Sequence, residues 1–354
     1  MDDRERVLRA LHHQEPDRIA LWDAPWETTI ERWHAEGMPA DVGPHDYFGY
    51  AIGGIGADMT LRLQPEVIEE TDDFKIERDA DGAVTKMWKG KVSTPELIDY
   101  TITSAEEWDR VRDRLVFSPD RVDLEACRNA MKGGRERGYF MQYFGGGIGY
   151  DKIMRFVGNE RVLVAMAEEP EWILDMFLAS ARLIVDAGAY LLDNGIEYDG
   201  VFIYNDMGYR NGALFSPAMY RTLQKPADAM VFDFFHERGL KVILHSCGCV
   251  RELVPDLVDA GLDCLQPLEV KAGMDVVELK KSFGEKLSFM GNIDVRAMAA
   301  EDPAVIEEEI ARKVPVAMEG GGYVYHSDHS VPDNVSFERY QYVMRLVKEH
   351  GTYR

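Results

Sequence analysis

The segment KVILHSCGC, residues 241–249, ends an apolar run with side chains that can bind a metal ion. Residues two positions apart in an extended strand point to the same side, so His245 and Cys247 can address one point. Imidazole and thiolate together suit zinc, which accepts nitrogen and sulfur ligands. The alternative is a buried cysteine that acts as a small hydrophobic residue beside a hydrogen-bonded histidine. A zinc site needs at least a third ligand from elsewhere in the fold.

Several residues could supply that third ligand. The segment GYVYHSDHSVP places His329 at the end of the last predicted strand, where a closed barrel would turn it toward the middle. Cys249 follows Gly248, where the chain should already leave its strand, so we rank it below His329. Three protein ligands leave a fourth position open, as in catalytic rather than structural zinc sites. The remaining candidates are His326, Cys264, Asp328 and Glu269.

Short β-rich runs alternate with longer helical segments along most of the chain. The visible runs are RIALWD, GYFMQYFG, DGVFIYND, KVILHSCG, DCLQPLE, KLSFMGNID and GYVYHSDH. Helical segments are predicted at 171–193, 217–236, 250–260 and 303–318. This alternation predicts a parallel sheet, and the length fits an α/β protein of the (β/α)8 TIM-barrel class. The eighth strand–helix unit is then hidden between Asp23 and Gly138.

No Pro/Ser-rich linker or low-complexity tract divides the chain, so we predict one TIM-barrel domain over residues 1–354. Residues 58–103 form an exception, because MTLRLQPEVIEETDDFKIERDADGAVTKMWKGKV alternates apolar and polar residues around the turn ADG. We interpret 58–103 as a β-rich insertion, a β-meander that leaves the main fold.

Polar side chains follow several predicted strands, and active sites of such barrels gather at the carboxyl ends of the strands. We therefore predict catalytic roles for Asp206 and Asp328, and substrate binding by Asn205 and Asn292. Tyr143 belongs to a set of aromatic residues that could line an apolar ligand pocket, and we predict substrate binding for it too. The alternatives are that loops are polar in any case and that the aromatic residues are ordinary core.

Composition excludes several partners and locations. The formal net charge is -23, which disfavours nucleic acid and anionic membrane surfaces, because both attract basic patches. Only four cysteines are present, and the segment MDDRERVLRALHHQ lacks the apolar core of a signal peptide. No uninterrupted apolar run has the length of a membrane span. We expect a reduced, cytoplasmic protein.

Several longer segments are familiar by their order and spacing. They are RERVLRALHHQEPDRIAL, YDKIMRFVGNERVLVAMAEEPEWILDMF, YNDMGYRNGALFSPAMYRTLQKP, ILHSCGCVRELVPDLVDAGLDCLQPLE, MGNIDVRAM and GGYVYHSDHSVPDNVSFERY. Over nearly the whole chain they resemble the uroporphyrinogen decarboxylase superfamily, and within it the zinc- and corrinoid-dependent methyltransferases. The resemblance implies a TIM barrel.

The element H-x-C-G carries the likeness to the methyltransferase branch. In relatives that move methyl groups between a corrinoid protein and coenzyme M, its histidine and cysteine bind zinc together with a distal cysteine on the last strand. The resemblance therefore implies zinc at His245 and Cys247. This chain departs from the pattern at the distal position, where it has His329 in place of a cysteine, so its substrate is expected to differ from coenzyme M.

The resulting hypothesis is a zinc-dependent methyltransferase that moves a methyl group between a small molecule, a methyl ether or thiol, and a corrinoid. The chain has no D-x-H-x-x-G corrinoid-binding segment, so the corrinoid (cobalamin) is expected on a partner protein. One alternative is a cofactor-free decarboxylase, whose final motif also contains a histidine at the place of His329. The segment LWDAPWETTIERWHAEG opposes it, because only Arg32 is present where paired arginines would hold a substrate's carboxylates. The other alternative is a binding barrel without catalysis.

Overall fold

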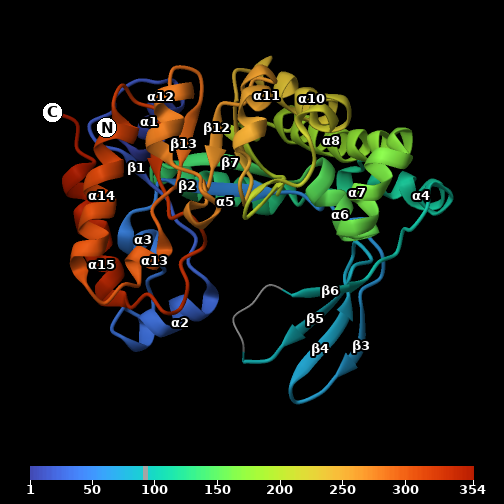
Figure 1. Cartoon of the computed structure of the whole chain (residues 1–354), viewed down its shortest axis with the longest axis horizontal. Coiled ribbons are helices and arrows are strands. Elements are labelled where there is room, and N and C mark those ends of the chain that lie inside the picture. The colour runs from blue at the N-terminus through green and yellow to red at the C-terminus, as the bar shows by residue number, and fades with distance from the viewer. Residues whose placement is uncertain (91–94) are drawn as a thin grey trace.

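The computed structural model describes residues 1–90 and 95–354. Within these residues a sheet of eight parallel strands forms the centre of the molecule (Figure 1). The strands are β1 (Ala20–Leu21), β2 (Ile52–Gly56), β7 (Phe140–Gly147), β8 (Gly200–Tyr204), β11 (Lys241–His245), β12 (Cys264–Gln266), β13 (Ser288–Met290) and β14 (Tyr323–Tyr325).

The strands lie in the sheet in chain order, and β14 pairs in parallel with β1. Across the gap that remains between β1 and β2, the N–H of Ala51 donates to the carbonyl of Leu21 at 2.7 Å. The predicted (β/α)8 class is confirmed, and β2 is the strand that the sequence left hidden. Its sequence IGGIG contains no long apolar run, because Gly54 makes room for a side chain of β7. A Cβ at Gly54 would lie 2.0 Å from Cε2 of Phe144.

Alternation along the strands creates an inner and an outer core. The inner core consists of side chains that point into the barrel, and α1 (Asp3–Leu11) contributes to it with Val7, Ala10 and Leu11. Because Ser288 Oγ at the start of β13 donates to the carbonyl of Ala10 at 3.2 Å, α1 closes the amino-terminal end of the barrel. The site must therefore open at the carboxyl end. The strand residues of the inner core are Ala20, Ile52, Phe140, Phe202, Ile243, Cys264, Met290 and Val324.

Helices cover the outer face of the sheet (Figure 1). They are α2 (Glu27–Ala35), α3 (Pro44–Phe48), α4 (Ala105–Val111), α5 (Leu124–Glu136), α6 (Gly149–Val157), α7 (Asn159–Glu168), α8 (Pro170–Asp193), α9 (Pro217–Met219), α10 (Lys225–His236), α11 (Val254–Asp259), α12 (Val276–Phe283), α13 (Val295–Met298), α14 (Pro303–Met318) and α15 (Phe337–His350). A π-helical turn at Tyr220–Gln224 joins α9 to α10 within the single helix that the sequence predicted. None of the helices in the described part of the chain has the length and apolar character needed to cross a bilayer.

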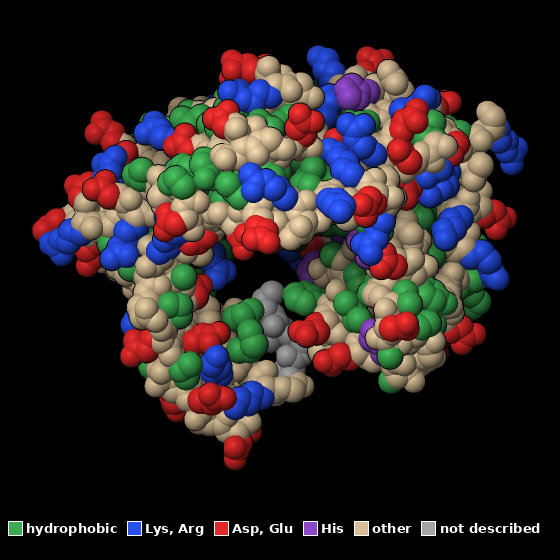
Figure 2. Space-filling model, turned by 180° about the vertical axis from the view of Figure 1, so that it is seen from behind, with side chains coloured by type: hydrophobic (Ala, Val, Ile, Leu, Met, Phe, Trp, Pro, Cys, Tyr) green, Lys and Arg blue, Asp and Glu red, His purple; other side chains and the backbone are tan. Residues whose placement is uncertain are grey.

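A four-stranded antiparallel sheet projects from the barrel between β2 and α5 (Figure 1). Its strands are β3 (Glu66–Glu70), β4 (Phe74–Arg78), β5 (Val84–Trp88) and β6 (Glu96–Asp99). This sheet lies within the predicted insertion 58–103, of which 91–94 fall outside the described residues. A largely buried ion pair between Asp81 and Lys152 of α6, 2.7 Å, ties the sheet to the barrel. Because the insertion follows the carboxyl end of β2, it stands beside the open end of the barrel, where the surface is hollowed (Figure 2).

Candidate metal-binding active site

Three donor side chains meet where β8 and β11 end. The donor atoms of Asp206, His245 and Cys247 all lie within 4.8 Å of one another, the one such cluster among residues 1–90 and 95–354. Nε2 of His245 is 3.3 Å from Sγ of Cys247 and 3.3 Å from Oδ1 of Asp206. The nitrogen, sulfur and oxygen donors are all types that zinc accepts. The residues present therefore fit a zinc ion.

Close packing of two backbone segments brings Asp206 to the other two donors. The N–H of Cys247 donates to Oδ1 of Asp206 at 2.8 Å, so the carboxylate is held by the loop after β11. Gly248 has φ +77°, and a Cβ there would lie 2.3 Å from the carbonyl carbon of Gly208. Only glycine allows this approach, because any side chain would push the two loops apart.

The three side chains also set one another's charge. Burial lowers the pKa of His245, but its hydrogen bonds to Asp206 and Cys247 outweigh burial and leave that pKa well above its usual value. Burial raises the pKa of the Cys247 thiol, and the neighbouring imidazole only partly offsets this. Burial likewise opposes ionisation of Asp206, yet contact with His245 leaves its pKa lowered. Each of the three side chains therefore changes the proton affinity of the other two.

A cavity of about 330 Å³ opens onto the three donors. Its walls are largely aromatic: the rings of Phe202 and Tyr204 are 5.0 Å apart, and Tyr204 is 5.1 Å from the ring of His245. In the part of the chain that the structure describes, none of the residues that line it is a lysine or arginine. The cavity therefore suits an apolar substrate group next to the donor cluster. Its lining residues are Trp22, Ala24, Trp26, Phe202, Tyr204, Asp206, His245, Cys247, Gln266, Pro267, His326, His329 and Ser330.

The predicted third zinc ligand, His329, lines the same cavity. Its ring lies 6.3 Å from the ring of Trp26, and its Nδ1 is 3.3 Å from the carbonyl of Ser330. It does not belong to the group of donors within 4.8 Å, whereas Asp206, predicted as a catalytic residue, does. A ligand role for His329 stays a prediction.

Two predicted substrate-binding residues point away from the cavity. Tyr143 is fully buried and packs against Tyr198 and Phe235 on the helix side of β7, with ring distances of 5.7 Å and 6.3 Å. Asn205 is also fully buried, and its Oδ1 accepts from the N–H of Asp151 at 3.1 Å. Both occupy the strand positions that alternate with inward-facing residues, so neither is among the lining residues. Their substrate roles stay predictions.

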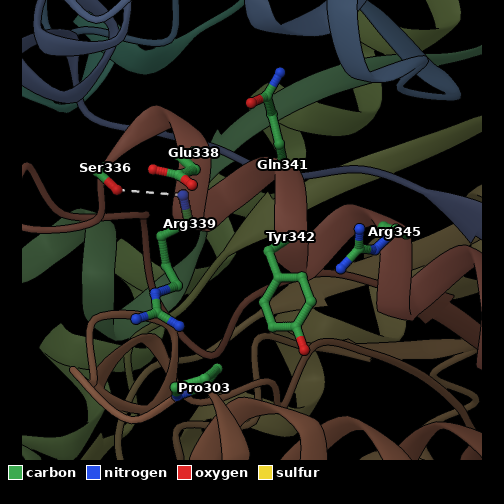
Figure 3. Close-up of a pocket in the computed structure, with 7 residues that line it drawn as sticks. All are labelled: Pro303, Ser336, Glu338, Arg339, Gln341, Tyr342 and Arg345. Carbon is green, nitrogen blue, oxygen red and sulfur yellow. Dashed lines mark hydrogen bonds between the residues drawn. The ribbon is translucent and has the colours of Figure 1, made fainter.

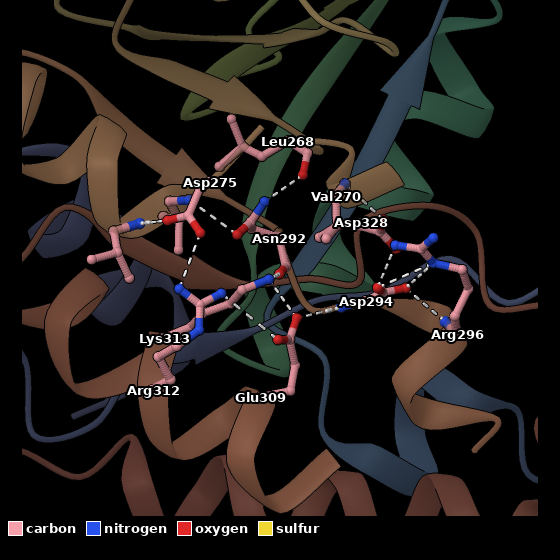
Figure 4. A network of polar contacts seen from close by, with 12 residues as sticks. Leu268, Val270, Asp275, Asn292, Asp294, Arg296, Glu309, Arg312, Lys313 and Asp328 are labelled. Atoms are coloured by element: carbon pink, nitrogen blue, oxygen red, sulfur yellow. Dashed lines mark hydrogen bonds and ion pairs between the residues drawn. The ribbon is translucent and has the colours of Figure 1, made fainter. Parts of the chain in front are cut away.

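Asn292 and Asp328, at the ends of β13 and β14, serve as acceptors and donors for neighbouring loops (Figure 4). Asn292 has φ +72°; its Oδ1 accepts from Val276 N–H at 3.0 Å, and its Nδ2 donates to the carbonyls of Leu268 and Met274. The two carboxylate oxygens of Asp328 accept from the N–H groups of two other residues at 2.9 Å each. These residues are Val270 and Val295. Neither Asn292 nor Asp328 lines the cavity.

Strand periodicity could have indicated four of the lining residues, of which the sequence had suggested only His326, as a candidate third zinc ligand. Phe202 and Tyr204 occupy alternate positions of β8 that lead to Asp206. Gln266 pairs in register with His245, and His326 follows the inward-facing Val324. Extending the alternation that relates His245 to Cys247 across the neighbouring strands would have found all four.

A larger hollow of about 680 Å³ lies along α15 (Figure 3). Its walls include Glu338, Arg339, Tyr342 and Arg345, and none of its lining residues belongs to the donor cluster. The side chains are those of an exposed helix face. The smaller cavity is therefore the candidate active site.

Comparison with known proteins agrees with this architecture. Residues 154–350, more than half of the chain, match the family model described as uroporphyrinogen decarboxylase (URO-D). The chain therefore belongs to the uroporphyrinogen decarboxylase family. None of the curated proteins matches the sequence.

One solved structure shows the fold independently. A methyltransferase from Methanosarcina mazei is similar, with a TM-score of 0.68 and 16% identity over 99% of each chain. At this identity the likeness shows the shared fold. A glycerophosphoryl diester phosphodiesterase from Parabacteroides distasonis has a TM-score of 0.36 and 12% identity, over 95% of this chain and 92% of that one.

Proposed function

We propose that this protein is a zinc-dependent methyltransferase that transfers a methyl group between a small molecule and a corrinoid carried by a partner protein. The observation that carries the proposal is the cluster of Asp206, His245 and Cys247 at the mouth of an aromatic cavity. The resemblance of H-x-C-G to the zinc-binding element of methyltransferases and the fold shared with a methyltransferase support it. The few cysteines support a reducing, cytoplasmic location.

His245, Cys247 and Asp206 would hold the zinc ion, and His329 stands on the same cavity as a further proposed ligand. Zinc bound there would act as a Lewis acid that lowers the pKa of a substrate thiol or polarises the oxygen of a methyl ether. Nε2 of His245 would have to be free of a proton to hold zinc, because a ligand nitrogen must present its lone pair.

The chain's own side chains would position the substrate. Trp22, Trp26, Phe202 and Tyr204 would hold its apolar part and exclude water from the donor cluster. A corrin ring with its side arms is larger than the 330 Å³ cavity, so it would approach over the open end of the barrel. A cobalt centre held there by the partner protein would give or receive the methyl group.

The decarboxylase alternative finds less support. A substrate with many carboxylates needs cationic partners, and within residues 1–90 and 95–354 no lysine or arginine lines the cavity. Arg32 of α2 pairs with Glu36 at 2.7 Å and contacts the carbonyl of Asp333. The Arg32 guanidinium is thus paired with groups outside the cavity.

The test is methyl transfer between methylcobalamin and small thiols, and demethylation of aryl and alkyl methyl ethers with cob(I)alamin, in zinc-loaded and zinc-stripped protein. We expect turnover with at least one substrate, its loss on removal of zinc, and its recovery on adding zinc back. Turnover of the same extent in the stripped protein would contradict the role of zinc. Tight binding of a ligand without any transfer, including with corrinoid proteins added, would favour the non-catalytic barrel.

A further inference from the structure

Two further side chains form a chain of hydrogen bonds that ends on His245. Gln266 is the last residue of β12, where it pairs in register with His245 of β11, and its Oε1 is hydrogen-bonded to Nδ1 of His245. Its Nε2 lies 3.3 Å from Nε2 of His326, which follows β14. Gln266 is 3% exposed and His326 2% exposed, so water does not compete for these contacts.

The backbone carbonyl of Ser327, which contacts His326, determines which atom donates in each hydrogen bond from His326 through Gln266 to His245. Nδ1 of His326 lies 2.6 Å from the carbonyl oxygen of Ser327 and 3.7 Å from Oδ1 of Asp23. Both oxygens can only accept, so Nδ1 of His326 carries a proton. The buried ring is neutral, because burial lowers its pKa. Its Nε2 is then an acceptor.

An acceptor at His326 Nε2 fixes the amide of Gln266. The amide must turn its NH2 group toward His326, because the opposite orientation would set the oxygen against a lone pair. The amide oxygen then faces His245 and accepts from Nδ1–H. With Nδ1 protonated, the neutral His245 ring presents the lone pair of Nε2 to the other two donors, 3.3 Å from each.

We propose that Gln266 and His326 are positioning residues that select the His245 tautomer able to bind zinc. The inference rests on the proposed zinc site and adds the groups that prepare it. Partners that orient a ligating histidine typically change metal affinity by about 10- to 100-fold. Neither residue needs to contact the metal or the substrate for this effect.

The test is zinc affinity, measured by competition with a chromophoric chelator, in Gln266→Leu, Gln266→Glu and His326→Phe. We expect Gln266→Leu to weaken zinc binding about 10- to 100-fold, because Nδ1 loses its acceptor. Gln266→Glu keeps an acceptor and should bind within a few-fold of wild type. Gln142→Leu is the matched control, since Gln142 is a similarly buried glutamine of β7 whose side chain has no hydrogen-bond partner among the described residues. It should leave zinc affinity unchanged.

The double variant Gln266→Leu/His326→Phe tests whether His326 acts on His245 through Gln266, which we call the relay, or independently of it. His326→Phe should weaken zinc binding several-fold in the wild-type background and have no further effect in Gln266→Leu. Equal effects in both backgrounds, or wild-type affinity in Gln266→Leu, would overturn the relay while leaving the zinc site intact. If the wild-type protein binds no zinc, the proposed function and the relay both fail. Circular dichroism and thermal midpoints identify any variant whose loss of zinc reflects unfolding.

Discussion

The ends of β8 and β11 differ from the ends of β13 and β14, although all four strands end in polar side chains. Asp206 and His245 turn part of their polar surface toward a cavity, with side chains 42% and 19% exposed. Asn292 and Asp328 are 0% and 2% exposed, and backbone groups of neighbouring loops occupy their polar atoms. The first pair of strand ends is free for chemistry, whereas the second holds the loops in place.

The difference teaches how to interpret a polar residue at the end of a barrel strand. A carboxylate that already accepts two backbone hydrogen bonds, as Asp328 does, has little capacity left for a ligand. Asp206 accepts one backbone hydrogen bond and still meets His245. Residue type and position are equal in the two cases, so local backbone geometry decides which carboxylate is open to the cavity.

The largest effect is expected from Cys247→Ser and His245→Ala. Loss of a direct ligand should weaken zinc binding by more than the roughly 100-fold that a supporting partner can contribute. The measurements are metal content after dialysis and zinc affinity, with Asn292→Ala as the control from the other region. Zinc retained at one equivalent in both cluster variants would remove the distinction between the regions.

A buried carboxylate that is not among the residues lining the cavity makes stability depend on pH. Asp228 in α10 is 0% exposed, and burial raises its pKa to about 7, although Tyr220 and Gln224 donate to it. Because the native pKa lies above the unfolded value, the folded state binds the extra proton between about pH 4 and 7. Stability from this group is therefore full at low pH and is lost as the pH rises.

Asp228→Asn should remove this dependence. The free energy of unfolding of the variant minus that of wild type should be higher at pH 7.5 than at pH 4.5 by on the order of 3 kcal/mol, because wild type loses most of the stabilisation from the bound proton over this interval at about 1.4 kcal/mol per pKa unit. Urea unfolding at both pH values measures the difference. A difference that is the same at pH 4.5 and 7.5 would show that Asp228 does not titrate in this range.

Asn292→Ala tests the supporting role of the second region. The substitution leaves one backbone N–H and two carbonyls without their partner and places alanine at φ +72°. We expect a loss of about 3 kcal/mol in the free energy of unfolding, with zinc affinity unchanged at temperatures where the variant is folded. A variant as stable as wild type that fails to bind zinc or substrate would return Asn292 to the active site.

The smallest effect is expected for Tyr143→Phe. The hydroxyl makes a weak contact with Sδ of Met59 at 3.6 Å on the side of β7 that faces the helices. Its removal should cost less than about 1 kcal/mol and leave methyl transfer unchanged. A large rise in KM would instead support the substrate role predicted from the sequence.

Sequence periodicity explains which features could be predicted. Apolar runs with polar ends reveal a strand such as β11, and the two-residue spacing places His245 and Cys247 on one side of it. The glycine-rich strand β2 has no such run, because the ring of Phe144 from the neighbouring strand β7 fills the space that a side chain at Gly54 would take. The sequence could not join Asp206 to the cluster, since that contact depends on backbone packing between two loops.

The most direct test of the zinc cluster is X-ray absorption at the zinc K-edge on the zinc-loaded protein. We predict one sulfur ligand at about 2.3 Å, with the remaining nitrogen and oxygen ligands at about 2.0–2.2 Å. The sulfur contribution should vanish in Cys247→Ser. A shell of nitrogen and oxygen alone in the wild-type protein, or a sulfur signal that persists in Cys247→Ser, would contradict a zinc site at the ends of β8 and β11.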